Sequence, residues 1–167
     1  MTERTLVVDY AACTGCRNCE MACSVFHVLA CNPSKSAVRV VKLAREGLEV
    51  PVVCQQCEDP ACASVCPVEA ISRDPTTGAV TVDPDLCVGC RMCIVACPFG
   101  AVTFDSDRRR PIKCDLCGGV EPWCVRFCEP GALTYEVPST ANIAQKRAAA
   151  RRLFEGYGRS TPSGPRL

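Results

Sequence analysis

Short apolar runs, interrupted every few residues by glycine, proline or charged side chains, predict short strands along most of the chain. Residues 4–13 (RTLVVDYAAC) predict an opening strand, and residues 131–137 (GALTYEV) predict a closing one. Residues 48–54 (LEVPVVC) and 101–105 (AVTFD) predict two further strands. None of these runs is long enough to form a large sheet by itself.

The middle of the chain shows an internal symmetry. Residues 70–87 (AISRDPTTGAVTVDPDLC) predict two strands around a turn at 74–78, where aspartate, proline and glycine favour chain reversal. A short helix is expected on each side, at 60–67 (PACASVCP) and at 92–98 (MCIVACP). This repetition indicates a twofold-related unit within residues 48–105.

Residues 139–155 predict a C-terminal helix, because Ser139 or Thr140 can cap it and ANIAQKRAAARRLFE is rich in good helix formers. An apolar stripe and a basic remainder leave two interpretations. The helix packs on its own domain, or it docks a partner or a second copy of the chain. Residues 156–167, rich in glycine, serine and proline, are expected to form a flexible tail.

Composition shows what these short elements lack. Of 167 residues, 17 are cysteine, the 48% hydrophobic content includes them, and only 5% are aromatic. This is thin for an ordinary core, so something other than side-chain packing is expected to hold the fold together. The net charge is +1, and one basic run at 108–110 amid balanced charge does not indicate nucleic-acid binding.

Sixteen of the cysteines form four groups, and Cys31 is left over. In chain order the groups are Cys13, Cys16, Cys19, Cys23; Cys54, Cys57, Cys62, Cys66; Cys87, Cys90, Cys93, Cys97; and Cys114, Cys117, Cys124, Cys128. Groups one and three have the spacing C-x2-C-x2-C-x3-C, and groups two and four lengthen only the middle gap. In bacterial ferredoxins with this spacing, three cysteines hold one [4Fe–4S] cluster and the fourth holds its neighbour.

Other uses of the cysteines fit less well. Zinc takes two separated cysteine pairs and gives no reason for the Cys-Pro ending of groups two and three. Structural disulfides are disfavoured by the close spacing and by the reducing compartment that we expect. Cys31 is interpreted as a small buried thiol, and the lone His27 as a packed or surface side chain rather than a ligand.

The symmetric segment 48–105 contains groups two and three, so these are expected to share two clusters. Groups one and four are then left for each other. The alternative is serial pairing, one with two and three with four, which would leave the short symmetric link between groups two and three without a role. The predicted fold is α+β, with a split outer ferredoxin-like module (1–47 and 106–138), an inserted inner module (48–105) and the C-terminal helix. Crossover of each fourth cysteine gives four ligand sets. They are Cys13, Cys16, Cys19, Cys128 (cluster 1); Cys114, Cys117, Cys124, Cys23 (cluster 2); Cys54, Cys57, Cys62, Cys97 (cluster 3); and Cys87, Cys90, Cys93, Cys66 (cluster 4).

The span 5–137 resembles the iron–sulfur subunits of molybdenum and tungsten pterin oxidoreductases, such as dimethyl sulfoxide reductase and formate dehydrogenase. The resemblance rests on the nested order of the groups and on the runs KCDLC (113–117) and PWCVRFC (122–128). It implies the pairing one with four and two with three. Among members, the short chain is most similar to the small subunit of a cytoplasmic tungsten aldehyde oxidoreductase. Group four departs from the pattern, since Glu129 separates Cys128 from Pro130; Trp123 stands beside Cys124 without replacing it, so a full cubane is expected.

The resemblance implies an electron-transfer subunit, not an enzyme by itself, which relays single electrons through four [4Fe–4S] clusters between a catalytic subunit and a redox partner. The alternatives are a free, diffusing polyferredoxin and an iron–sulfur assembly or sensory protein, which four complete groups disfavour. No signal peptide, twin arginine or run of 18 apolar residues is evident, so a cytoplasmic protein without membrane insertion is expected. An exported partner can nevertheless carry such a subunit without a signal of its own.

Four assembled clusters would change the net charge from +1 to about −7. Four cations lie inside the binding runs, and each is either a solvated surface charge or a group that raises the local potential or marks a docking surface near a cluster. They are Arg17, Arg91, Lys113 and Arg126. Five apolar side chains are expected to cover the inner clusters and limit water. They are Val68, Ile71, Ile94, Val95 and Phe99.

Overall fold

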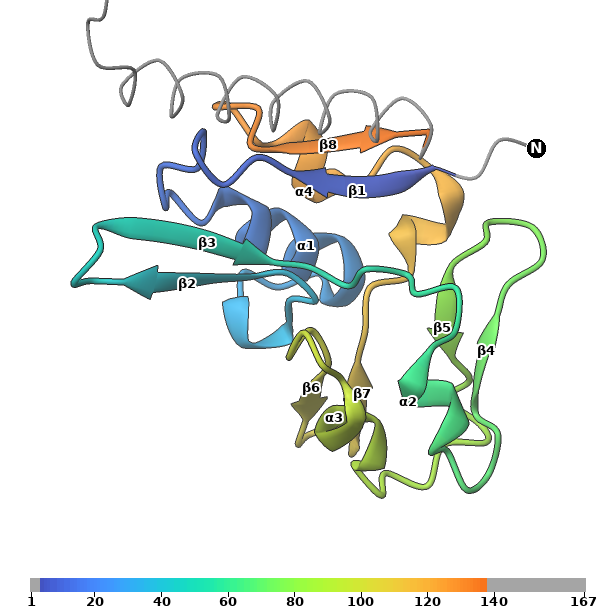
Figure 1. Cartoon of the computed structure of the whole chain (residues 1–167). Helices are drawn as coiled ribbons and strands as arrows, with labels where there is room; N and C mark the ends of the chain where they lie inside the picture. The colour runs from blue at the N-terminus through green and yellow to red at the C-terminus, as the bar shows by residue number, and fades with distance from the viewer. Residues whose placement is uncertain (1–3, 138–167) are drawn as a thin grey trace, which may run out of the picture.

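The computed structural model describes residues 4–137, so the expected helix at 139–155 and the tail at 156–167 lie outside the described residues. Four two-stranded antiparallel sheets, joined by short helices, make up the described fold (Figure 1). The pairs are β1 (Thr5–Val8) with β8 (Leu133–Glu136), β2 (Arg39–Leu43) with β3 (Leu48–Val52), β4 (Ile71–Arg73) with β5 (Val80–Val82), and β6 (Thr103–Asp105) with β7 (Arg110–Ile112). The helices are α1 (Asn18–Val28), α2 (Ala61–Ser64), α3 (Met92–Ala96) and α4 (Trp123–Arg126), with 3₁₀ turns η1 (Pro33–Lys35) and η2 (Leu116–Gly119).

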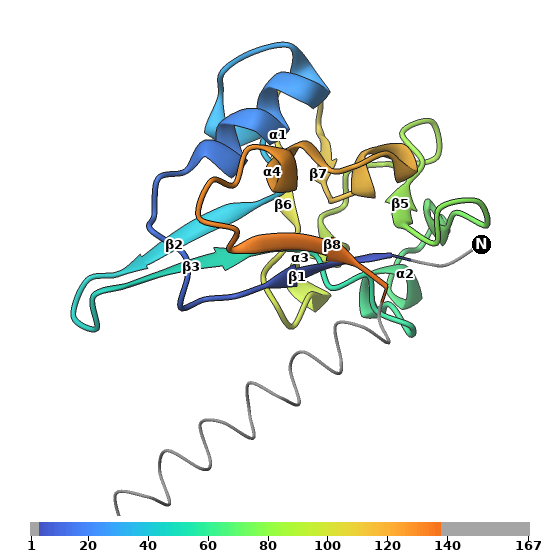
Figure 2. The same cartoon turned by 90° about the horizontal axis from the view of Figure 1, so that it is seen from above.

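The two ends of the described chain meet in one sheet. Leu6 of β1 lies opposite Tyr135 of β8, and Val8 lies opposite Leu133. Leu6 and Leu133 are buried, so this sheet covers the core with one face. Figure 2 shows β1 and β8 running side by side. The opening and closing strands expected from the sequence are confirmed.

The turn between β4 and β5 also forms as expected. The Asp74 carboxylate accepts hydrogen bonds from the Thr76 N–H (2.7 Å) and the Thr77 N–H (3.3 Å). Gly78 follows with φ +72°, a conformation that other residues rarely adopt. The side chain of Asp74 therefore fixes the turn that joins the two strands.

The hairpin of β2 and β3 was not expected. Its strands pair from Arg39 opposite Val52 to Leu43 opposite Leu48, and it projects from one side of the molecule (Figure 1). The expected module boundary at 47/48 falls in the turn of this hairpin. The second boundary, at 105/106, falls in the turn between β6 and β7. A strand ladder therefore crosses each boundary.

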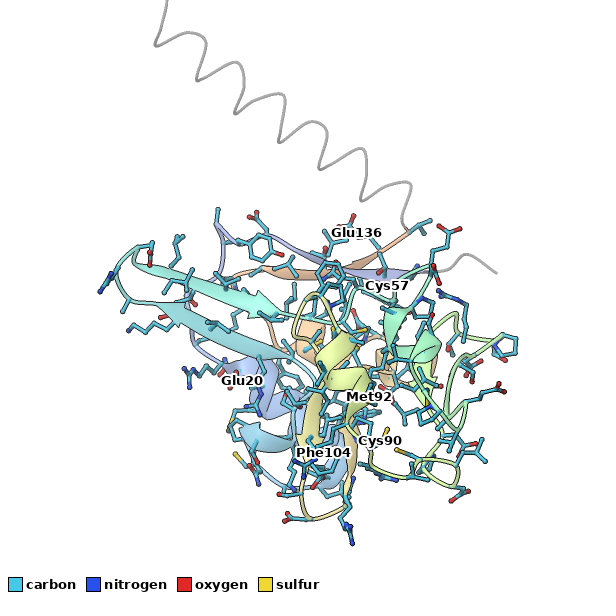
Figure 3. The ribbon with its side chains drawn as sticks, turned by 60° about the horizontal axis from the view of Figure 1, so that its bottom comes forward. Glu20, Cys57, Cys90, Met92, Phe104 and Glu136 are labelled. Atoms are coloured by element: carbon cyan, nitrogen blue, oxygen red, sulfur yellow. The ribbon has the colours of Figure 1, made fainter. Side chains whose placement is uncertain are left out.

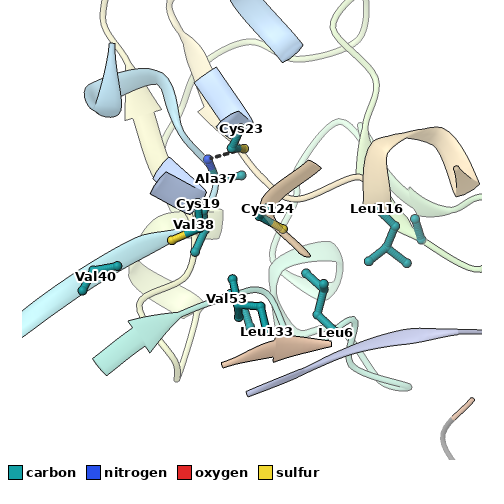
Figure 4. Close-up of a cluster of buried hydrophobic side chains, with 11 residues drawn as sticks. Leu6, Cys19, Cys23, Ala37, Val38, Val40, Val53, Leu116, Cys124 and Leu133 are labelled. Atoms are coloured by element: carbon teal, nitrogen blue, oxygen red, sulfur yellow. Dashed lines mark hydrogen bonds between the residues drawn. The ribbon is translucent and has the colours of Figure 1, made fainter. Parts of the chain in front are cut away.

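Two small cores hold the described residues, and cysteines are part of both. The larger core gathers around β1, β8 and α1 (Figure 4); it contains Leu6, Cys19, Cys23, Ala37, Val38, Val40, Val53, Ala79, Leu116, Cys124 and Leu133. The smaller core lies between α2, α3 and the strands β4 and β5; it contains Cys62, Ile71, Val80, Cys93 and Val102. The cysteines occupy positions where an ordinary core would have aliphatic side chains.

Helix α1 is joined to β2 by a buried carboxylate. Glu20 is 3% exposed and accepts a hydrogen bond of 2.7 Å from the Val40 N–H. The helix ends at Leu29, whose left-handed conformation lets its N–H bond to the Val25 carbonyl at 3.0 Å. Helix α1 is therefore fixed to β2 near its start and ends in a capped turn at Leu29.

A second polar contact joins the segment after α1 to the hairpin of β6 and β7. The Lys35 ammonium contacts the Asp105 carboxylate and lies 2.6 Å from Asp107 Oδ2. Asp105 also accepts hydrogen bonds from the Asp107 N–H (2.9 Å) and the Arg108 N–H (3.1 Å). Burial opposes ionisation of Asp105, but these partners outweigh it and hold the pKa of its carboxyl below the ordinary range.

Candidate iron–sulfur sites

Groups one and three use the same backbone path. Gly15 and Gly89, each directly before the second cysteine, have φ of +71° and +70°. Arg17 and Arg91, each directly after that cysteine, have φ of 62° and 67° and precede the helices α1 and α3. Two left-handed residues at the same positions curl the chain, so that three cysteines can face one point.

Groups two and four also have a left-handed residue directly before the second cysteine, Gln56 (φ 49°) and Leu116 (φ 54°), and add a proline after it. Pro60 and Pro122 stand two residues before the third cysteine and are extended, with ψ of 103° and 131°. Each begins a single-turn helix, α2 or α4, that presents the third cysteine. The longer middle gaps of these groups are therefore taken up before the helix begins.

Groups one and four come together around the larger core. Helices α1 and α4 pack against each other, and Cys19, Cys23 and Cys124 are buried there. One cavity is lined by Cys23, Cys114, Cys117 and Cys124 together with apolar side chains and His27. These four cysteines are the set expected for cluster 2.

Groups two and three come together around the smaller core, and α2 packs against α3. One cavity is lined by Cys54, Cys57, Cys62 and Cys97. Another is lined by Cys66, Cys87, Cys90 and Cys93. In both cavities the fourth cysteine comes from the other group. Figure 3 shows Cys57 and Cys90 on their loops, with Met92 following Cys90.

Two further members of the set expected for cluster 1, Cys16 and Cys128, lie near Cys19. Burial raises the pKa of the Cys19 thiol to about 12, and the nearby Cys128 and Cys16 raise it further. The Cys128 sulfur accepts a hydrogen bond of 3.4 Å from the Leu133 N–H, which places it under β8. A thiol-only donor set of this kind is the one that holds [4Fe–4S] clusters in ferredoxins.

Burial raises the pKa of further ligand candidates. It raises the pKa of the Cys114 thiol to about 12 and that of Cys93 to about 11, and it raises the pKa values of Cys62 and Cys124. Without a metal these thiols therefore keep their protons at neutral pH. Binding of iron must release those protons, so cluster loading and protonation compete.

The four sites differ in exposure. Cys16 and Cys90 are exposed, and each belongs to a different set. The set around Cys114 and the set around Cys54 contain no exposed cysteine. We call the two sets without an exposed cysteine the enclosed sites and the two sets with one exposed cysteine the open sites.

His27 lies closer to the cysteines than the sequence predicted. Hydrogen bonds with Cys117 and Cys23 raise its pKa to about 10, and its Nε2 lies 3.5 Å from Asp115 Oδ1. Burial would raise the pKa of the Cys23 thiol, but hydrogen bonds from His27 and from the Ala37 N–H lower it. The spacing of four residues between Cys23 and His27 places both on one face of a helix, a signal that could have revealed the contact.

Two smaller expectations were wrong. Val95 is 84% exposed, because it lies on the side of the short α3 opposite to Cys93. Cys31 is exposed and not buried, since the chain turns outward after Leu29; its sulfur lies 3.1 Å from the sulfur of Met21. Ile71 is buried as expected, and Phe99, although 50% exposed, lines the cavity of Cys54 as expected.

No helix within residues 4–137 combines the length and the apolar character needed to cross a bilayer. All 17 cysteines lie within this range, and none of them is joined in a disulfide there.

Comparisons with known proteins agree with the cysteine pattern. A family model for a 4Fe-4S dicluster domain matches residues 46–137, and one for a 4Fe-4S binding domain matches residues 10–25. The polyferredoxin-like subunit of the aliphatic sulfonate oxidoreductase of Pyrococcus furiosus is 41% identical over 116 residues, which cover 70% of this chain and 66% of that protein. The electron transport protein HydN of Escherichia coli is 36% identical over 153 residues, covering 78% of this chain and 86% of that protein. The B subunit of the anaerobic dimethyl sulfoxide reductase of Escherichia coli is 34% identical over 153 residues, covering 80% and 73%.

Proposed function

Since this protein belongs to the 4Fe-4S dicluster domain family and is an electron-transfer iron–sulfur protein, we propose that it relays single electrons through four [4Fe–4S] clusters in two nested modules. The observation that carries the proposal is the set of three separate cavities, each lined by four cysteines. In every one, three cysteines come from one group and one from another. The fourth site would use Cys13, Cys16, Cys19 and Cys128.

Each module would have its own pair of groups. The outer module, residues 1–47 with 106–138, would use groups one and four; the inner module, residues 48–105, would use groups two and three. The packing of α1 on α4 and of α2 on α3 supports this pairing over the serial alternative.

A bound [4Fe–4S] cluster supplies one-electron chemistry and needs no substrate pocket. The cysteine thiolates hold the iron, and buried side chains such as Ile71 and Val80 exclude water from the inner sites. Backbone N–H groups point at sulfur, as at Cys23, which accepts a hydrogen bond of 3.4 Å from the Ala37 N–H. Such hydrogen bonds stabilise the additional negative charge of a reduced site.

The exposures suit a conducting series of sites with two open ends. Cys16 and Cys90 would lie at the terminal sites, where a partner can approach, and the two enclosed sites would lie between them. An electron would then pass through protein instead of solvent.

A catalytic subunit is the proposed partner. Two of the relatives above are subunits of oxidoreductases, which favours a bound subunit over a freely diffusing carrier. A pterin enzyme containing molybdenum or tungsten is the class that we propose. Purification under mild conditions tests this point, because a subunit elutes with its catalytic partner and a free carrier elutes alone.

Metal analysis tests the number of clusters. Anaerobically purified protein should contain about 16 iron and 16 sulfide per chain, the content of four cubanes. Two or four zinc ions without sulfide would contradict the proposal.

Paired substitutions test the crossover. If Cys97 belongs with Cys57, the double variant C57A/C97A should alter one cluster in the electron paramagnetic resonance (EPR) spectrum of the reduced protein, whereas C90A/C97A should alter two. The reverse result would assign Cys97 to its own group. C31A is the control and should alter none, since Cys31 lies outside the four groups.

A further inference from the structure

Two side chains reach from one enclosed site to the other, one in each direction. Gln56, from the loop of group two, donates a hydrogen bond of 2.9 Å from Nε2 to the carbonyl oxygen of Cys114. Lys113, directly before Cys114, donates in the other direction from Nζ to Cys54 Sγ, at 3.2 Å. Each loop thus sends one side chain to a cysteine of the other site.

The Lys113 ammonium is not a freely solvated charge. It also donates to the Val80 carbonyl oxygen and lies 3.4 Å from Gln56 Oε1, which accepts the Val80 N–H at 2.8 Å. An ammonium has three N–H groups, so Cys54, Val80 and Gln56 account for all of them. Lys113 is half-buried and lines the cavity that contains Cys54.

The charge of Lys113 also remains available to the sulfur. Among its hydrogen-bond and ion-pair partners within residues 4–137 there is no carboxylate that would neutralise it. The Cys128 sulfur accepts a hydrogen bond from a neutral backbone N–H group, and the Cys23 sulfur accepts one from the Ala37 N–H and another from His27. No lysine or arginine in the described part of the chain donates to a sulfur at the two open sites. Lys113 therefore gives the site of Cys54 an ammonium donor, whereas the other enclosed site has the imidazole of His27.

We propose that Lys113 is a positioning residue that raises the reduction potential of the site formed by Cys54, Cys57, Cys62 and Cys97. Gln56 and Lys113 together fix the path by which an electron crosses between this site and that of Cys114. The inference rests on the proposed function. When one electron moves across, the site of Cys114 is oxidised by one electron and the site of Cys54 is reduced by one, with no proton or bond change in this chain. The added negative charge falls partly on the thiolate sulfurs, where a charged N–H donor stabilises it.

The test uses the intact holoprotein in redox titrations followed by EPR. In K113M, the equilibrium constant for reduction of one cluster should fall about tenfold, the effect of losing one charge-assisted hydrogen bond, which corresponds to about 59 mV for one electron. K113R keeps the charge and should restore most of the shift. K42M is the matched control, because Lys42 is an exposed lysine paired with Glu49, and it should change no potential.

The shifted signal is assigned with C57A. The cluster that C57A alters in the wild-type background must be the one that shifts in K113M. The inference is overturned if all four potentials stay unchanged in a K113M protein with full iron content, or if a different cluster shifts. Loss of iron from both K113M and K113R also overturns it, since the lysine would then be required only for folding.

Iron analysis of the wild-type protein separates this inference from the proposed function. If the wild type contains four clusters and K113M shifts none, only the inference fails. If C57A alters no signal and the wild type lacks about 16 iron, the proposed function fails and the inference with it.

Discussion

The turns of groups one and three follow one backbone path in two different surroundings. Gly15 and Gly89, and likewise Arg17 and Arg91, have nearly equal φ. After the turn, however, α1 runs for 11 residues and α3 for only 5. The geometry that places the cysteines is thus repeated, while the length of the helix after it is not.

The residues next to the two turns also differ. Next to Cys19 stands the buried Glu20, bonded to β2, and next to Cys93 stands the apolar Ile94. Exposed apolar side chains surround group three: Leu86, Val88, Met92, Val95 and Phe99. The cysteine-binding turn therefore depends on its glycine, its left-handed residue and its cysteine spacing. The side chains around the turn can differ between the groups.

Removal of iron should have the largest effect and should abolish the difference between the turns. Both cores contain ligand candidates, Cys19 and Cys124 in one and Cys62 and Cys93 in the other. A structural metal site contributes on the order of 10 kcal/mol to folding, which is comparable to the whole stability of a typical domain. Chelation should therefore expose backbone amides throughout, as measured by hydrogen exchange. Protection that persists around α1 would show that its packing suffices without metal.

Alanine in place of the two glycines should distinguish the turns. Both substitutions place a side chain at positive φ, with a penalty of about 1–3 kcal/mol. A Cβ at Gly89 would lie 2.5 Å from the Arg109 carbonyl oxygen, whereas a Cβ at Gly15 would meet the flexible side chain of Glu49. G89A should therefore lower the free energy of unfolding by about 1–3 kcal/mol more than G15A.

Thermal unfolding of the two holoproteins measures the difference. Iron content serves as the control for cluster loading. Equal destabilisation by G15A and G89A would mean that the Arg109 carbonyl moves aside as readily as the Glu49 side chain.

Loss of the contact between Lys35 and Asp105 should have the smallest effect on stability. D105N removes the charge that Lys35 contacts and should lower Tm by about 2–4 °C. D107N is the matched control, because Asp107 contacts the same lysine but is 79% exposed, whereas Asp105 is 3% exposed. A larger effect of D107N would contradict the role of the buried carboxylate.

The pH dependence of this contact follows from the lowered pKa of Asp105. A depressed carboxyl pKa stabilises the fold above the ordinary aspartate value of about 3.9 and loses that effect as pH falls through the folded-state pKa. The difference in Tm between D105N and wild type should therefore stay constant between about pH 5 and pH 8.

Turn residues and strand patterns made much of the fold predictable. Asp74 and Gly78 predicted the β4–β5 turn, and the apolar runs at 5–8 and 133–136 predicted β1 and β8. The β2–β3 hairpin was missed, since residues 39–43 carry no flanking cysteine motif and their partner strand was assigned to the inner module alone. The interruption of β7 by Pro111 similarly hid a strand that pairs with β6.

The candidate sites were predictable in their cysteines but not in their neighbours. A fixed cysteine spacing identifies candidate cluster ligands, because the ligands of one cluster must all surround it. Contacts such as Gln56 with Cys114 and Lys113 with Cys54 join loops from distant parts of the sequence, so no local pattern reveals them. The exposure of Val95 could have been inferred from its position two residues after Cys93 on a helix.

The meeting of β1 with β8 also orders the events of biosynthesis. A ribosome releases Leu6 long before Tyr135, its partner across the sheet. Groups two and three, close together in sequence, can close early over a short loop, whereas the sheet of the chain ends must wait for nearly all of the described residues to emerge. The first cysteines translated are therefore among the last to be enclosed.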